Sequence, residues 1–328
     1  MNEPSSANDI RITRVYDAPV ALVWEAWTDP KQVVQWWGPR GFTVTTHSRD
    51  LRAGGSWVYT MHGPDGTDYP NFTRYHEVEP QARLMYDHGA TSEDAAPMFR
   101  VTATFRDLHG KTELDIRMTL PTAEAAQQTR VFIKAAGGNA TWDRLAEFLE
   151  HAISRTEIFV INRSFEAPVA TVYDMWTSPA HLATWLPPAG FAMAFKHADI
   201  RSGGAATFSL SSGEVTMFAR HDYRELHRPD RLVYAQTFID EHGAVSRLSG
   251  APTWPVTTLV TVLLAEEGPM QTRVTVRFEV EGPATAEEMT TFVEERAGMT
   301  RGWSASFDAL DAVLGGANDA GRRLVGSE

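Results

Sequence analysis

The chain of 328 residues contains one long segment twice, and this repeat limits its fold more than any other feature. Residues 14–42 read RVYDAPVALVWEAWTDPKQVVQWWGPRGF, and residues 163–191 read RSFEAPVATVYDMWTSPAHLATWLPPAGF. Aligned without a gap, roughly 13 of the 29 positions are identical. They include Pro19/Pro168, Trp27/Trp176, Pro30/Pro179, Trp36/Trp185, Pro39/Pro188 and Gly41/Gly190. An offset of 149 residues is the length of a domain and too long for a solenoid unit, so we infer a duplicated domain.

The repeat continues along the chain. Residues 50–55 read DLRAGG and residues 199–204 read DIRSGG, while Trp142 returns as Trp303. We therefore expect a first domain over residues 8–150 and a second over residues 157–314, joined around residues 151–156. Residues 315–328 are rich in Gly, Asp and Arg and predict a flexible tail.

The composition excludes several classes of protein. A hydrophobic content of 43% with 22% charged residues is typical of a soluble globular protein. The absence of cysteine excludes disulfides and thiolate metal sites. The net charge of −12 argues against nucleic acid or an anionic membrane as a partner. Since no apolar run has the length of a membrane span and the N-terminal residues lack a signal-peptide core, we expect a cytoplasmic protein.

The pattern within each copy predicts an α+β fold. One alternating strand precedes two short helices, about six further strands and one long helix. Asp29-Pro30 and Ser178-Pro179 predict the start of the second short helix, and residues 285–288 (TAEE) predict a capping box in copy two. Only the long helix is large enough to cover the apolar face of an antiparallel sheet, and a curved sheet around a helix leaves room for a cavity.

Glycines lie within both long helices, namely Gly137 and Gly138 in copy one and Gly298 and Gly302 in copy two. Each costs roughly 0.5–1 kcal/mol relative to alanine inside a helix, so we expect the helices to be broken there. A kink, a close approach to the sheet and space for a ligand are three explanations that the sequence leaves open.

These motifs resemble a known family. The segments APVALVWEAWTDP, QWWGP, DLRAGGSW and GPDG, together with a tryptophan in the last helix, are similar to the Hsp90-ATPase-activator-homologue-1-like family. That family belongs to the START/SRPBCC helix-grip superfamily. The resemblance implies two tandem domains, each with a seven-stranded sheet around a long helix and an apolar cavity. It also implies likeness to lipid carriers, polyketide cyclases, stress proteins and antibiotic self-resistance proteins, including those of enediyne producers.

Candidates for chemistry are few. The chain has no nucleophile elbow, zinc-binding helix motif, phosphate loop or dinucleotide fingerprint, so we expect no catalytic residues, no metal and no cofactor. Tyr75 and Glu77 are two apart on a strand, as are Tyr223 and Glu225, so we expect the members of each pair to share a strand face. They suit an acid–base pair, but we favour a structural role in which Glu77 binds an arginine such as Arg83.

Aromatic and polar residues of the strands and helices supply the candidate cavity wall. His88 shares a strand face with Leu84 and Tyr86, and its counterpart is Gln236. Trp37, Trp57, Tyr59 and Met61 become Leu186, Ala206, Phe208 and Leu210 in copy two, so we expect the second cavity to be larger. The full set of ligand-binding candidates is Trp37, Trp57, Tyr59, Met61, Tyr86, His88, Trp142, Trp185, Phe208, Tyr234, Gln236, Trp254 and Trp303.

Three functions agree with these observations. The first is binding of a hydrophobic or aromatic small molecule, lipid-like or polyketide-like, for sequestration or self-resistance. The second is an enzyme of the cyclase or hydrolase kind that uses the same cavity with His88, Tyr75 and Glu77. The third is a chaperone-associated interaction protein. We favour the first, because the cavity wall is aromatic and a catalytic set is missing.

Overall fold

The chain forms two units, Met1–Ile153 and Ser154–Glu328. This computed structural model describes residues 6–135, 140–154, 156–248 and 250–325, and it does not describe the side chains of residues 132, 134, 135 and 317–325. Gly137 and Gly138 lie outside the described residues.

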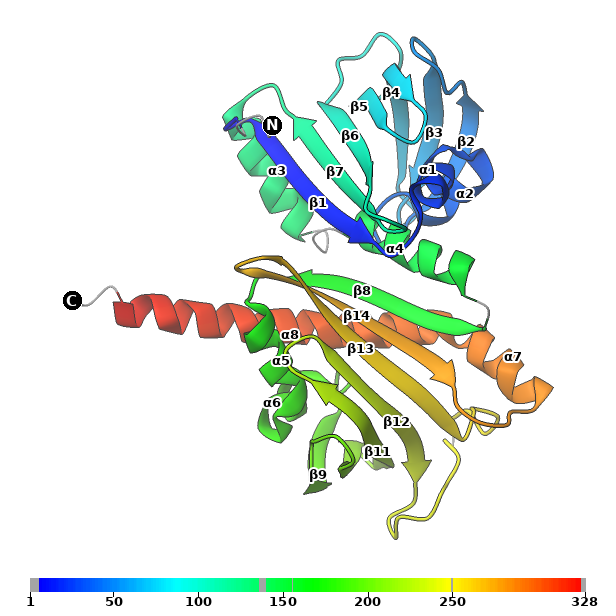
Figure 1. Ribbon diagram of the computed structural model, residues 1–328, viewed down its shortest axis with the longest axis vertical. Helices are drawn as coiled ribbons and strands as arrows, with labels where there is room; N and C mark the ends of the chain where they lie inside the picture. Colours follow the sequence, from blue (N-terminus) through cyan, green and yellow to red (C-terminus); the bar gives the residue numbers. More distant parts are fainter. Residues whose placement is uncertain (1–5, 136–139, 155, 249, 326–328) are drawn as a thin grey trace. The chain divides into compact units, whose positions relative to one another are not determined.

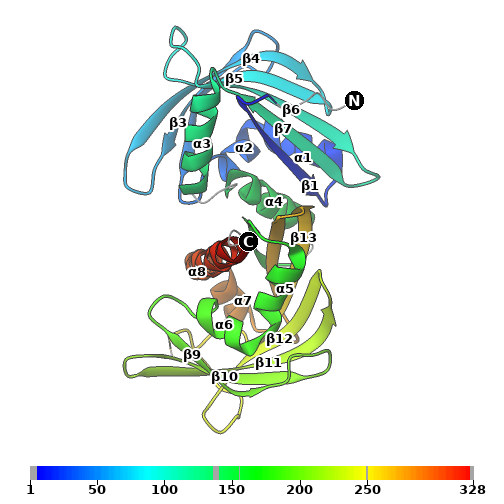
Figure 2. The ribbon, with the colours of Figure 1, turned by 90° about the vertical axis from the view of Figure 1, so that its left-hand side faces the viewer.

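The first unit is a seven-stranded antiparallel sheet with four helices (Figure 1). In chain order its elements are β1 (Asp9–Tyr16), α1 (Val20–Thr28), α2 (Pro30–Trp36), β2 (Thr43–Arg49), β3 (Ser56–His62), β4 (Asp68–Glu79), β5 (Arg83–Ala90), β6 (Phe99–Asp107), β7 (Thr112–Thr119), α3 (Ala123–Ala135) and α4 (Ala140–Ile153). The strand order is β1-β7-β6-β5-β4-β3-β2. Figure 2 shows all four helices inside the curve of this sheet.

The second unit repeats this topology. Its elements are β8 (Ile158–Phe165), α5 (Val169–Thr177), α6 (Pro179–Trp185), β9 (Ala192–Ala198), β10 (Ala205–Ser212), β11 (Val215–His227), β12 (Arg231–Ile239), β13 (Thr257–Gly268), β14 (Gln271–Val280), α7 (Ala286–Glu294) and α8 (Arg296–Val325). The strand order β8-β14-β13-β12-β11-β10-β9 corresponds strand by strand to the first sheet. The predicted α+β fold with two tandem helix-grip domains is confirmed.

The repeated tryptophans make the same contact in both units. Trp36 donates from its indole N–H to the carbonyl of Ala26 at 3.0 Å, and Trp185 donates to the carbonyl of Met175 at 3.0 Å. Both indoles are buried. Each bond joins the end of one short helix to the end of the helix before it. The repeated tryptophan therefore has the same packing role in both units.

The predicted helix starts are also present. The carboxylate of Asp29 accepts from the backbone N–H groups of Lys31 and Gln32 at 2.7 and 3.0 Å. Thr285 and Glu288 form the predicted capping box. These bonds satisfy N–H groups that the first turn of a helix leaves without partners.

The repeated glycine pair marks a tight turn in each unit. A Cβ on Gly55 would lie 2.2 Å from the carbonyl oxygen of Asp50, and one on Gly204 would lie 2.1 Å from that of Asp199. Real Cβ atoms do not approach backbone oxygens this closely, so the turn admits only glycine at both positions.

The last helix differs from the prediction in two respects. The expected break at Gly298 and Gly302 is wrong, because α8 begins at Arg296 and continues through both. The interruption lies at Glu295, between α7 and α8. α8 also continues to Val325, so residues 315–325 are helical where we expect a flexible tail. Extending an existing helix is much easier than nucleating one, and the burial of Phe307, Leu310 and Leu314 outweighs the cost of two glycines.

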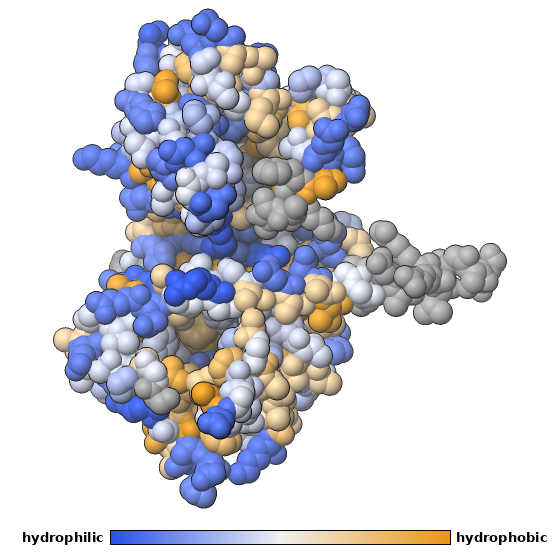
Figure 3. All heavy atoms as spheres, turned by 180° about the vertical axis from the view of Figure 1, so that it is seen from behind, coloured by the Kyte–Doolittle hydropathy of each residue, from blue (hydrophilic) through white to orange (hydrophobic). Residues whose placement is uncertain are grey.

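On the face shown in Figure 3, hydrophilic residues cover much of the first unit, whereas hydrophobic residues gather around a hollow on the second unit. No helix among the described residues is long and apolar enough to cross a membrane.

Candidate functional site

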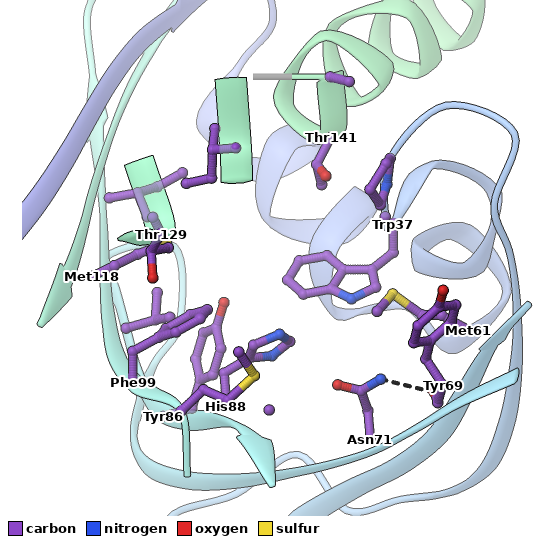
Figure 4. Close-up of a pocket in the computed structure, with 18 of the residues that line it drawn as sticks. Trp37, Met61, Tyr69, Asn71, Tyr86, His88, Phe99, Met118, Thr129 and Thr141 are labelled. Carbon is purple, nitrogen blue, oxygen red and sulfur yellow. Dashed lines mark hydrogen bonds between the residues drawn. The ribbon is translucent and has the colours of Figure 1, made fainter. Parts of the chain in front are cut away.

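The first unit contains a cavity of about 660 Å³ between the sheet and the helices. Strands β5, β6 and β7 form one wall, α3 and the start of α4 lie opposite, and Trp37, Gly38 and Pro39 of the loop after α2 also line the cavity (Figure 4). The apolar lining comes mainly from Ile12, Trp37, Met61, Tyr86, Phe99, Val101, Ile116, Met118, Ile133 and Trp142. A cavity of this size and composition can hold a small molecule of several rings.

Five of the predicted site residues line this cavity, and two do not. Trp37, Met61, Tyr86, His88 and Trp142 border it. Trp57 and Tyr59 lie behind Trp37 in the core, where their rings stack with centroids 4.0 Å apart. They are 2% and 0% exposed, so they support the wall without forming its surface.

His88 is the central polar side chain of the wall. Its ring lies against that of Phe99, with centroids 5.0 Å apart, and its Nδ1 is 3.5 Å from the hydroxyl of Tyr59. Burial lowers the pKa of His88 to about 4. The imidazole is therefore neutral at pH 7. It carries one N–H proton, on either Nδ1 or Nε2, and the other nitrogen is an acceptor.

Further polar groups face the same space, and the sequence analysis missed them. Asn71 is 7% exposed and donates from Nδ2 to the carbonyl of Tyr69 at 2.9 Å. Thr129 and Thr141 contribute hydroxyls from α3 and α4. Asn71 could have been predicted from the alternation of β4. It lies on the same strand face as Thr73 and Tyr75, which are also buried.

A network of hydrogen bonds fixes the loop after α2, which lines part of the cavity. Arg144 on α4 donates to the carbonyls of Gly38 and Pro39, each at 2.9 Å, and to that of Gln35 at 3.0 Å. Further bonds at 3.3 Å reach the carbonyls of Trp37 and Phe42. Desolvation lowers the pKa of Arg144, yet arginine stays charged at neutral pH. The guanidinium thus holds Trp37 and its loop in place.

The second unit has a smaller cavity of about 240 Å³. Phe208, Tyr234, Gln236, Trp254 and Trp303 line it as predicted candidates. Trp185 does not border it and lies fully buried against Trp176.

The prediction that the second cavity is larger is wrong. Ala206, which replaces Trp57, is 0% exposed and lies in the core behind the cavity wall. The loss of the indole therefore removes side-chain volume behind the wall and does not enlarge the cavity. Trp254 lies in the loop between β12 and β13, which is longer than the corresponding loop between β5 and β6 of copy one. It packs on Phe292 at 5.7 Å between ring centroids and fills part of the space. Close packing of the interior takes up the removed volume.

A buried histidine in the second cavity was also missed. The Nε2 of His221 lies 3.3 Å from the Oε1 of Gln236, and its ring packs on Tyr234 with centroids 4.3 Å apart. Burial lowers the pKa of His221 to about 4. Its alternation with Ala219 and Tyr223 on β11 was the available signal.

Comparison with known proteins gives the family of the chain. The family model described as activator of Hsp90 ATPase homolog 1-like protein matches residues 17–150 and again residues 166–315. The chain belongs to this family. Each match covers one of the two units, which confirms the tandem duplication.

Solved structures include several with similar chains. A protein from Arthrobacter aurescens is 27% identical, with a TM-score of 0.40, over 46% of this chain and 91% of its own. One from Nitrosomonas europaea is 22% identical, with a TM-score of 0.42, over 45% of this chain and 98% of its own. DynU16, a protein in the dynemicin biosynthetic locus, is 20% identical, with a TM-score of 0.32, over 94% of this chain and 99% of its own. No curated protein matches the chain. The assignment to the Hsp90-activator-like family depends on the family model.

The tyrosine–glutamate pairs do not form an acid–base site. Glu77 binds Arg83 at 2.9 Å between carboxylate and guanidinium, and Glu225 binds Arg231 at 3.0 Å, as the preferred interpretation predicts. The expectation that Tyr75 and Glu77 share a face is wrong. A β-bulge between them, repeated in the second sheet, turns Tyr75 into the core and Glu77 outward.

Metal-binding groups are equally scarce. The described residues contain no cluster of three or more His, Asp or Glu side chains that could hold an ion. The described lining of the first cavity offers apolar contact, hydrogen bonding from neutral groups and one carboxylate, that of Asp68.

Proposed function

We propose that the chain is a binding protein for an apolar, aromatic small molecule and that its first domain holds the ligand. The supporting observation is the cavity of about 660 Å³ with Trp37, Phe99 and Trp142 on its wall. Aromatic side chains favour flat ring systems, because edge and face contacts add to the burial of apolar area. A polyketide-like or other polycyclic compound suits this wall better than a single flexible chain.

The binding role is favoured over catalysis by the surroundings of the polar groups. His88 lies beside Phe99, Trp37 and the Tyr59 hydroxyl, with no carboxylate hydrogen-bonded to it among the described residues. Its low pKa makes it a weak base. Retention of an unchanged molecule would suit sequestration, including self-protection of a producing cell.

A titration with a blocked cavity tests this function. Thr129→Phe on α3 places a ring in the cavity, whereas Glu124→Phe adds the same ring at an exposed site on the same helix that does not line it. We expect polycyclic aromatic compounds to bind the native chain and Glu124→Phe, measured by calorimetry. Binding to Thr129→Phe should be at least about tenfold weaker, because the filled site has no room for the rings.

Two other outcomes would count against the proposal. Equal binding to both variants would place the ligand elsewhere. Chemical change of the compound during incubation, followed by chromatography, would support the cyclase or hydrolase alternative.

A further inference from the structure

Two polar atoms on the wall of the first cavity have no partner among the described residues. They are Nε2 of His88 and Oδ1 of Asn71, and both side chains line the cavity. Figure 4 shows both side chains pointing into the cavity from neighbouring parts of the sheet. Polar groups in an otherwise apolar pocket normally find partners, and these two are available to water or to a bound molecule.

The core behind the wall bears on which nitrogen of His88 carries the proton. The indole N–H of Trp37 can only donate, and it donates to the hydroxyl oxygen of Tyr59 at 3.2 Å. The Tyr59 hydroxyl proton then has two acceptors within reach, the hydroxyl of Thr73 and Nδ1 of His88, 3.5 Å away. With Nδ1 as the acceptor, the imidazole proton lies on Nε2, and His88 presents an N–H donor to the cavity.

The charge of the wall is equally informative. The described lining includes one ionisable acid, Asp68, and neither lysine nor arginine. Asp68 binds His62 at 2.6 Å at the rim. An anion in this cavity would lose its hydration without gaining a cationic partner, and such burial is strongly unfavourable.

We infer that the first cavity selects neutral aromatic molecules that carry a carbonyl-type oxygen, which the Nε2–H of His88 recognises, and that it rejects the same skeleton in anionic form. This inference rests on the proposed function and narrows it to one ligand class. Tyr59 is a positioning residue in this account, since it acts on the ligand only through the proton of His88. Asn71 offers an acceptor for a hydroxyl of the same ligand.

Three compounds of one skeleton separate the inference from the proposed function. Anthracene, 2-acetylanthracene and anthracene-2-carboxylate have the same rings, and the last two have similar shapes. Calorimetric titration of the full chain at pH 7 should rank 2-acetylanthracene first. The carboxylate should bind at least about tenfold more weakly, because its charge is buried without a partner. If none of the three binds, the proposed function fails. If the carboxylate binds as well as the ketone or better, the inference fails while the binding function stands.

Variants of His88 test the donor itself. His88→Leu should weaken binding of 2-acetylanthracene by about fivefold more than binding of anthracene, because only the ketone uses the N–H. His88→Gln, the residue found at the corresponding position 236, keeps a donor and should restore most of the difference. His242→Leu, which changes an exposed histidine of the second unit, is the control and should leave all affinities unchanged. Equal losses for ketone and hydrocarbon in His88→Leu would show that the histidine only shapes the cavity.

A spectroscopic measurement tests the role of Tyr59. The ¹⁵N shifts of His88 should show a proton on Nε2 in the native chain and a mixture of both tautomers in Tyr59→Phe. Because Tyr59 does not line the cavity, a purely structural role would leave the tautomer unchanged. A native His88 with its proton on Nδ1 would overturn the proposed recognition.

Discussion

The guanidinium of Arg144 donates to the backbone carbonyl of Pro39 at 2.9 Å and so joins α4 to the loop after α2 that lines part of the first cavity. Three more carbonyls of the same loop and that of Gln35 in α2 share this side chain. Charged hydrogen bonds to partly buried groups are strong, and their loss leaves several carbonyls without partners.

Removing this side chain should therefore destabilise the first domain. Arg144→Met keeps much of the apolar stem and is expected to lower the free energy of unfolding by about 3 kcal/mol. Chemical denaturation of the first domain's transition measures this value. Arg301→Met, on the exposed face of α8, is the matched control. If Arg144→Met lowers the free energy of unfolding no more than the control does, water satisfies these carbonyls as well as the guanidinium does.

The equivalent tryptophans Trp36 and Trp185 should respond equally to substitution. Replacement of either by phenylalanine keeps most of the ring volume and removes the bond to the carbonyl of Ala26 or Met175. The buried carbonyl then lacks a partner, at a cost of about 2 kcal/mol beyond the change in packing. Denaturation of the two single variants, each followed in its own domain, compares these costs. A large cost in one domain alone would mean that the contact has lost its role in the other.

The stability of the second domain should fall at acidic pH because of His221. Its folded-state pKa of about 4 lies below the ordinary value of 6.5, so the unfolded chain binds a proton that the folded chain does not. Stability is thus full above pH 6.5 and is lost as the pH falls toward 4, by up to about 3 kcal/mol. His221→Phe keeps the ring packing and should flatten this part of the profile. His227→Phe, at an exposed site, should not.

Truncation of Trp254 should open the second cavity. The indole is 8% exposed and lies on the wall of that cavity against Phe292. Trp254→Ala should cost about 3–5 kcal/mol and leave additional space, since a packed core relaxes only in part. We expect the variant to bind polycyclic compounds in its second domain, detectable as an additional site by calorimetry. An unchanged number of sites together with the expected loss of stability would mean that the cavity collapses.

Much of the fold followed from patterns that repeat at short range. The strand alternation, Asp29-Pro30 and the capping box at residues 285–288 are local signals, and the structure contains all of them. The continuity of α8 could not be predicted in this way. It depends on tertiary burial of Phe307, Leu310 and Leu314, which offsets the intrinsic preference of Gly298 and Gly302.

The cavity wall was harder to predict because substitutions in a core act indirectly. The exchange of Trp57 for Ala206 suggests a gain in volume, yet both residues lie behind the wall. Which residue forms the surface of a cavity depends on layers of neighbours that are distant in sequence. The β-bulge after Tyr75 is a similar case. One extra residue shifts the register, so the side chains that follow point to the opposite faces of the sheet.

The unequal volumes of the two cavities, about 660 and 240 Å³, also bear on stoichiometry. Two domains of one ancestry suggest a bivalent receptor, in which occupancy of one site could influence the other. Because the second cavity is smaller than the roughly 300 Å³ at which ligand pockets begin, binding of polycyclic compounds should saturate at one equivalent per chain and follow a simple hyperbola. Gene duplication here would then have doubled the scaffold without doubling its capacity.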